Sequence, residues 1–140
     1  MNAESIKRKP MKIIGAAIDC EDENALADFY AQMLGSTKTY SGNGFAVISS
    51  LEHPSLLVFQ AVDHYQKPVW PWEKGKPAQM MHFDFFVENL DEAVEHAKAC
   101  GAIMSGIQFF EGTSVTMFDP AGHPFCLSTV WEEALYAKCT

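Results

Sequence analysis

Apolar residues recur every three or four positions in two segments of the chain, 23–34 and 90–100. This spacing places them on one side of a helix. Acidic residues precede the first segment, Asn89 precedes the second as a capping residue, and each segment is followed by a glycine, Gly35 or Gly101. Such residues are typical of helix starts and ends. The pattern therefore predicts two helices with these bounds.

Shorter stretches rich in β-branched and aromatic residues surround both helices and predict strands. One lies directly before each helix, over 12–18 and 80–87. The others follow the helices and cover 45–49, 56–62, 114–118 and 125–130. Ser41-Gly42-Asn43-Gly44, directly before the first of these, indicates a turn between two strands. The order of strand, helix and several strands therefore occurs twice.

The two halves align as an internal repeat. When Gly15 is placed over His82, Asp22 falls over Asn89 at the helix starts. Each half is too short to bury much core by itself, so the halves are expected to pack together. We predict one domain over 11–131, with a tail over 1–10 and a C-terminal helix or tail over 132–140. Within it, module one covers about 11–62, a proline-containing linker 63–79, and module two about 80–131.

Composition narrows the function classes. The chain has 10 Lys and Arg against 18 Asp and Glu, a net charge of −8, which argues against a nucleic-acid partner. No apolar run is long enough for a membrane helix, and the N-terminal residues do not resemble a signal peptide. The four cysteines form no Cys-x-x-Cys pair, so free thiols are expected. These features predict a soluble, cytoplasmic protein without a membrane partner.

Three segments carry a family resemblance. Residues 18–35, IDCEDENALADFYAQMLG, resemble the first module of the vicinal oxygen chelate superfamily, which contains glyoxalase I, bleomycin-resistance proteins and extradiol dioxygenases. Residues 79–91, QMMHFDFFVENLD, and 119–127, DPAGHPFCL, are similar to its second module. The linker residues Pro68-x-Trp70-Pro71 resemble a glyoxalase-like subgroup.

The resemblance implies an α+β fold in which two βαβββ modules form an open, curved eight-stranded sheet around a cavity. It also implies a homodimer and, in typical members, a divalent metal. The positions of this chain that correspond to the family's metal ligands are Gly15, His82 and Cys126. The fourth lies on the strand 56–60, and Gln60 is the residue expected there. Only His82 matches the usual ligand type, so no bound metal is expected, although Cys126 could bind zinc as a thiolate.

The period of a strand places His82, Asp84 and Phe86 on one face. A histidine beside a carboxylate can act as a general base, because the carboxylate stabilises the imidazolium ion. The other interpretation is a buried polar pair without a catalytic role. Cys126 is similarly either a nucleophile activated by His82 or a small structural residue.

Aromatic residues are concentrated in the linker, where Trp70 and Trp72 either line a small-molecule pocket or anchor the loop itself. The residues expected to contact a ligand are Gln60, Trp70, Trp72, Phe86 and Cys126.

The function expected from these observations is binding of a small molecule in the cavity without the family's metal. The alternative is a lyase or isomerase. It would use His82 and Asp84 for acid–base chemistry, or a metal with relocated ligands such as Asp19 or Glu111.

Overall fold

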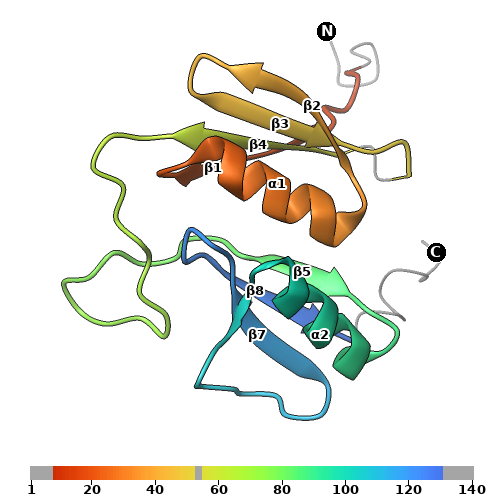
Figure 1. Cartoon of the computed structure of the whole chain (residues 1–140), viewed down its shortest axis with the longest axis vertical. Helices are drawn as coiled ribbons and strands as arrows, with labels where there is room; N and C mark the ends of the chain where they lie inside the picture. Colours follow the sequence, from red (N-terminus) through yellow and green to blue (C-terminus); the bar gives the residue numbers. More distant parts are fainter. Residues whose placement is uncertain (1–7, 53–54, 131–140) are drawn as a thin grey trace, which may run out of the picture.

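The computed structural model describes residues 8–52 and 55–130 and contains two βαβββ modules (Figure 1). The α+β fold predicted from the sequence is confirmed. Module one contains β1 (Gly15–Cys20), α1 (Glu23–Leu34), β2 (Thr37–Gly42), β3 (Phe45–Ser49) and β4 (Leu56–Ala61). Module two contains β5 (Phe83–Phe86), α2 (Leu90–Cys100), β6 (Ile103–Met104), β7 (Ser114–Phe118) and β8 (Pro124–Ser128).

The eight strands form two separate four-stranded sheets, ordered β1-β4-β3-β2 and β5-β8-β7-β6. In each sheet the first strand of the module pairs in parallel with the last strand, and the other pairs are antiparallel. The expected single eight-stranded sheet is therefore divided in two, and the described strands close no barrel. Strands β1 and β5 are edge strands, and side-chain packing rather than a hydrogen-bonded ladder joins the modules.

Both helices have the bounds predicted from the apolar spacing. The side chain of Asp22 accepts a hydrogen bond from the Ala25 amide at 3.0 Å, and that of Asn89 accepts one from the Glu92 amide at 3.0 Å. Each bond satisfies an amide that has no partner within the first helical turn. Gly35, with φ of 67°, ends α1 in the left-handed conformation that glycine adopts without strain.

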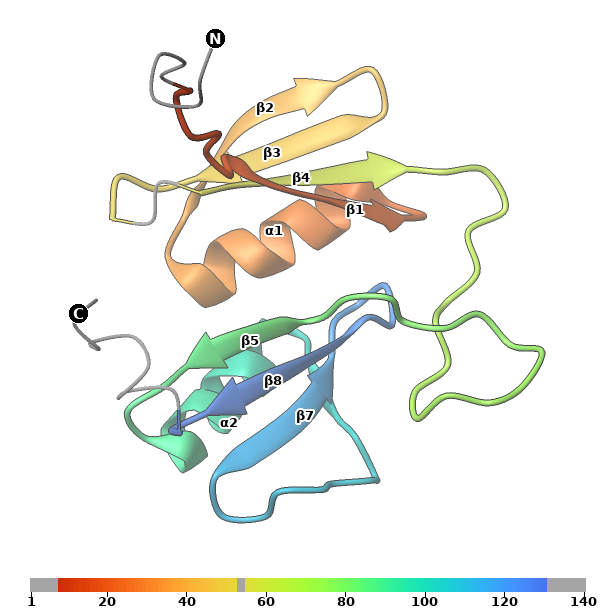
Figure 2. The ribbon, with the colours of Figure 1, turned by 180° about the vertical axis from the view of Figure 1, so that it is seen from behind.

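Helix α1 lies between the sheet of module one and the strands of module two (Figure 2). The fully buried ring of Tyr30 is central to this packing. It stacks on Phe59 of the first sheet at 5.5 Å between ring centroids. It also meets Phe83 and Phe125 of the second sheet edge-on at 5.8 and 6.3 Å. The modules therefore share one aromatic core, as expected for halves too short to fold separately.

A second contact of Tyr30 connects α1 to the β7–β8 turn. Its hydroxyl donates a hydrogen bond of 2.6 Å to Oδ2 of Asp119, which is 3% exposed. The other carboxylate oxygen accepts bonds from the amides of Ala121 and His123, at 2.9 and 3.0 Å. Burial raises the pKa of Asp119 above its ordinary value, despite the opposing effect of these hydrogen bonds.

Some predicted elements differ from the structure. Strand β5 begins at Phe83 rather than residue 80, because its only partner, β8, begins at Pro124 after a tight turn. Strand β1 covers Gly15–Cys20 rather than 12–18, and β6, with two residues, was too short to be indicated by its pattern. The predicted C-terminal helix or tail, and most of the N-terminal tail, lie outside the described residues. Neither described helix is long and apolar enough to cross a membrane.

Candidate functional site

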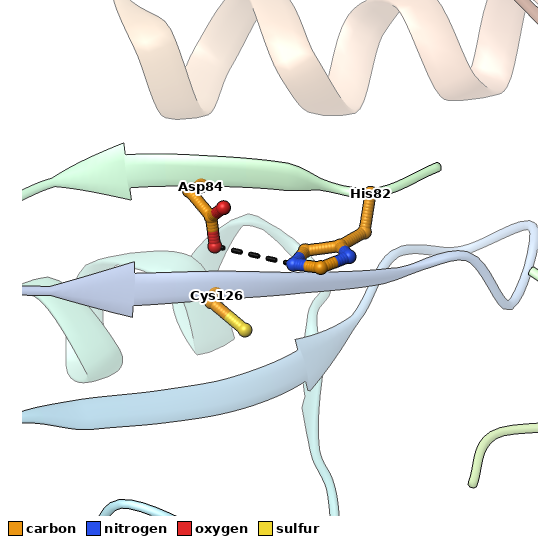
Figure 3. A group of neighbouring side chains, drawn as sticks. All are labelled: His82, Asp84 and Cys126. Atoms are coloured by element: carbon orange, nitrogen blue, oxygen red, sulfur yellow. Dashed lines mark ion pairs between the residues drawn. The ribbon is translucent and has the colours of Figure 1, made fainter. Parts of the chain in front are cut away.

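Three side chains capable of acid–base or metal chemistry gather on one face of the second sheet (Figure 3). His82 immediately precedes β5, Asp84 lies within β5, and Cys126 lies opposite Asp84 on β8. Cys126 is in turn paired with Thr116 of β7. Residues directly opposite one another in a sheet have side chains on the same face, so these strands form a polar row.

The three side chains are close enough to act on one ligand or ion. His82 Nε2 lies 3.2 Å from Asp84 Oδ1, and one donor atom of each residue lies within 4.8 Å of the other two. The Sγ atom of Cys126 lies 3.5 Å from the Thr116 hydroxyl. The side chains of His82 and Asp84 are 37% and 42% exposed. A small molecule or ion can therefore reach them, and they are not a buried polar pair.

The opposite face of the same strands is part of the core. The ring of Phe85 contacts those of Phe83 and Phe125, and all three contact Tyr30. Alternation along β5 and β8 thus separates an apolar, packed face from a polar, accessible one. The face-sharing of His82 and Asp84 predicted from the period of two is confirmed by their contact.

Gly15 cannot take part in any side-chain site. A Cβ atom built on it would lie 1.8 Å from the backbone oxygen of Leu56. The backbones of β1 and β4 therefore approach too closely here for a side chain. Gly15 is the module-one counterpart of His82. It has no side chain to bind a metal, and the close backbone of β4 leaves no room for one.

The fourth position corresponding to a family metal ligand was predicted at Gln60, and the strand pairing shows that this is the wrong residue. Cys126 pairs with the residue two positions after His82, and the residue two positions after Gly15 is Ala17, which pairs with Val58. Val58 is therefore the counterpart of Cys126. Gln60 pairs instead with Asp19, and its Nε2 donates a 2.5 Å hydrogen bond to Asp19 Oδ1. The structure does not bring Gln60 to the cluster of His82, Asp84 and Cys126. The predicted position was wrong because hydrophobic spacing along one strand does not determine its register with a distant strand.

The linker tryptophans have different environments. The ring of Trp70 meets Phe109 and Phe118 edge-on at 5.5 and 6.4 Å, whereas Trp72 is 65% exposed. Phe118 follows Thr116 by two residues on β7, so it belongs to the same sheet face. A groove of about 400 Å³ lies beside it, lined among others by Lys67, Trp70, Ile103 and Phe118.

Thr116, Phe109 and Phe118 were not singled out from the sequence. For Thr116 and Phe118 a signal existed in their alternation along the predicted strand 114–118. Phe109 lies in an irregular segment and carried no such signal. Phe86 lies two residues beyond Asp84 and shares its face by the same alternation.

A small cleft connects the two modules near His82. It has a volume of about 100 Å³ and is lined on one side by Ala16, Ala17 and Tyr30, and on the other by Met81, His82 and His123. Gly15 is not among its lining residues. His82 therefore lies at the module junction, where module one contributes apolar side chains of β1 and the ring of Tyr30 from α1.

The thiols differ in their expected reactivity. Cys20 is fully buried, and burial, with neighbouring carboxylates, raises its pKa to about 11. At pH 8 only about one Cys20 thiol in a thousand is ionised. We expect iodoacetamide to modify the partly exposed Cys126 at least ~100-fold faster than Cys20 in the native protein. Peptide mass spectrometry after timed alkylation measures both rates, urea-unfolded protein is the control, and equal native rates would contradict the prediction.

The architecture described above, two βαβββ modules with parallel first and last strands, is that of the vicinal oxygen chelate fold. A family model for the glyoxalase-like domain matches residues 15–128. The chain belongs to this glyoxalase-like family of the vicinal oxygen chelate superfamily. The comparison with curated protein sequences gives no match.

Several solved structures share the fold. One is the fosfomycin resistance protein FosX from Listeria monocytogenes, as a variant complexed with Mn(II) and 1S,2S-dihydroxypropylphosphonic acid. It is 18% identical, with a TM-score of 0.65, over 89% of this chain and 94% of that chain. A glyoxalase family protein from Enterococcus faecalis is 20% identical, with a TM-score of 0.63, over 84% and 96%. A glyoxalase/bleomycin resistance protein/dioxygenase family enzyme from Burkholderia phytofirmans PsJN is 16% identical, with a TM-score of 0.61, over 84% and 97%. At these identities the likeness concerns the fold.

Proposed function

We propose that this glyoxalase-like protein binds a small molecule on the open face of its second sheet, with His82 and Asp84 as the polar contacts. The observation that carries the proposal is the convergence of His82, Asp84 and Cys126 on an accessible face whose reverse side is filled by core phenylalanines. Small-molecule sites typically combine apolar and aromatic side chains with a few convergent polar groups.

Without a metal ion, the chemistry of the cluster favours a neutral or cationic ligand that donates hydrogen bonds. Asp84 contributes a half-exposed carboxylate, which lies beside the ring of His82. Among the described residues, the lysines that form ion pairs, Lys38 and Lys98, pair with other carboxylates and not with this cluster. The phosphonate held in the FosX structure is accompanied there by Mn(II). An anionic ligand of that kind would face Asp84 here, and like charges repel.

The proposal does not include the family's metal site built from both modules. Module one presents Gly15 and Val58 at the corresponding positions, and neither has a side chain that binds metals. The small-molecule site is therefore proposed within module two.

A screen of small molecules by thermal shift tests the proposal. A compound that stabilises the native protein is expected to bind Asp84→Asn and His82→Ala about 10–100-fold more weakly, because a hydrogen bond to a charged group contributes ~1.5–3 kcal/mol. Titration calorimetry measures the affinities. Asp91→Asn, an exposed carboxylate in the first turn of α2, is the matched control and should leave binding unchanged. Ligands that bind all three variants equally would place the site elsewhere.

A second candidate function, acid–base catalysis, is supported by the 3.2 Å contact between His82 and Asp84. In a lyase or isomerase reaction His82 would take a proton from the ligand, and Asp84 would orient the ring and stabilise its charged form. Product analysis of each compound found in the screen separates binding from turnover. Turnover that His82→Ala abolishes supports catalysis, and unchanged compounds support binding alone.

A further inference from the structure

We propose that His82, Asp84 and Cys126 form a zinc-binding site contained entirely within module two. Asp84 is the residue that changes the interpretation of the sequence. Among the positions that correspond to the family's metal ligands, only His82 has the usual ligand type, so the sequence predicts no metal. Asp84 is not one of those positions, and it supplies a further donor. This inference goes beyond the proposed small-molecule function and does not depend on it.

The donor atoms match zinc in number and type. An imidazole nitrogen, a carboxylate oxygen and a thiolate sulfur are its three usual protein donors, and a site with three protein ligands leaves one position open. Sulfur disfavours hard ions such as Mn²⁺ and Mg²⁺, which prefer oxygen. Zinc is therefore expected in preference to the Mn(II) held in the FosX structure.

The geometry requires little rearrangement. In a tetrahedral zinc site with bonds of ~2.0–2.3 Å, ligand atoms lie roughly 3.3–3.8 Å apart. His82 Nε2 and Asp84 Oδ1 are already 3.2 Å apart, and none of the three donor atoms is more than 4.8 Å from another. His82 lies just outside the hydrogen-bonded part of β5 and is 37% exposed, so its ring has space to turn.

The surroundings supply two features that a zinc site needs. The hydroxyl of Thr116, 3.5 Å from Cys126 Sγ, is placed to donate a hydrogen bond to the thiolate. Because His82 and Asp84 are 37% and 42% exposed, a zinc ion held by them would keep a position open to solvent or to a bound molecule. A zinc ion with an open position supplies Lewis acidity when bound.

The site is complete without module one. Asp84 takes the place of a ligand from β1, where the close approach of Gly15 to Leu56 leaves no room for a side chain. The three ligands come from β5, its preceding residue and β8, which are hydrogen-bonded neighbours. Their separation is thus determined by the pairing register of one sheet and not by how the modules pack.

Cobalt(II) binding to the reduced, metal-free, full-length protein tests this inference. Cobalt replaces zinc in such sites and gives a near-ultraviolet thiolate-to-cobalt charge-transfer band with visible bands of tetrahedral intensity. We expect one equivalent to bind, with both sets of bands, and zinc to displace it. Cys126→Ser should remove the charge-transfer band. Each of Cys126→Ser, His82→Ala and Asp84→Ala should weaken binding at least ~100-fold, and Thr116→Val about 10-fold.

Cys100→Ser and Cys139→Ser are the matched controls and should keep the band, and circular dichroism of every variant monitors folding. Absence of the band in the native protein, or its persistence in Cys126→Ser, would overturn the inference. Loss of the band in Cys139→Ser would also overturn it, because the sulfur ligand would then lie elsewhere. Failure of the small-molecule screen leaves this result unaffected, so the two proposals are tested separately.

Discussion

Replacing Gly15 with alanine is expected to lower the free energy of unfolding by about 3 kcal/mol or more, because the added methyl group has no space. Its carbon would lie 1.8 Å from the Leu56 carbonyl oxygen and 2.9 Å from the Leu56 nitrogen. Both atoms are backbone atoms and cannot move aside without separating β1 from β4. The amide of Leu56 also donates a 2.6 Å bond to the Ile14 oxygen, which that separation would break.

Urea unfolding measures this effect, with Gly106→Ala as the matched control. Gly106 has no atom within 4 Å of its added Cβ and has no positive φ. The same chemical change there should alter stability by no more than about 0.5 kcal/mol. Similar values for the two variants would show that β1 and β4 do not approach as closely as described. A larger loss of stability in Gly15→Ala than in Gly106→Ala would also mean that a histidine at position 15 cannot supply the family's metal ligand.

Replacing Asp119 with alanine is expected to destabilise the protein by about 3–4 kcal/mol, since three donors lose their acceptor. They are the hydroxyl of the buried Tyr30 and the amides of Ala121 and His123. The variant would weaken the β7–β8 turn and its connection to α1 together. Tyr30→Phe is the partial control, because it removes one bond and should cost about 1–2 kcal/mol. Equal losses in the two variants would show that the turn amides do not depend on Asp119.

The pH dependence of Asp119→Asn gives an independent measurement. Because burial raises the pKa of Asp119 in the folded state, the folded protein binds this proton more tightly than the unfolded chain. Its contribution to stability is therefore present below the ordinary value of 3.8 and is lost as pH rises through the raised pKa. Asparagine does not titrate, so the stability of the native protein relative to Asp119→Asn should fall from acid to neutral pH. A constant difference would contradict the raised pKa.

The secondary structure could be predicted where the controlling interactions are local. Both helices have the predicted bounds, because apolar spacing and the capping residues Asp22 and Asn89 lie within a few residues of the turns they stabilise. The strands 45–49 and 114–118 were also predicted correctly. The start of β5 was not, because it depends on where its distant partner β8 begins.

The candidate site could be predicted in part. That His82 and Asp84 share a face follows from a spacing of two residues along one segment, and the sequence by itself determined it. The sequence likewise determined the two-module order and the lack of a side chain at Gly15. The pairing of Cys126 with Asp84, the contribution of Thr116 and the exclusion of Gln60 were decided only by the tertiary structure. The physical reason is that register between strands distant in sequence depends on packing across the whole sheet, and a shift of one residue reverses the face of every side chain.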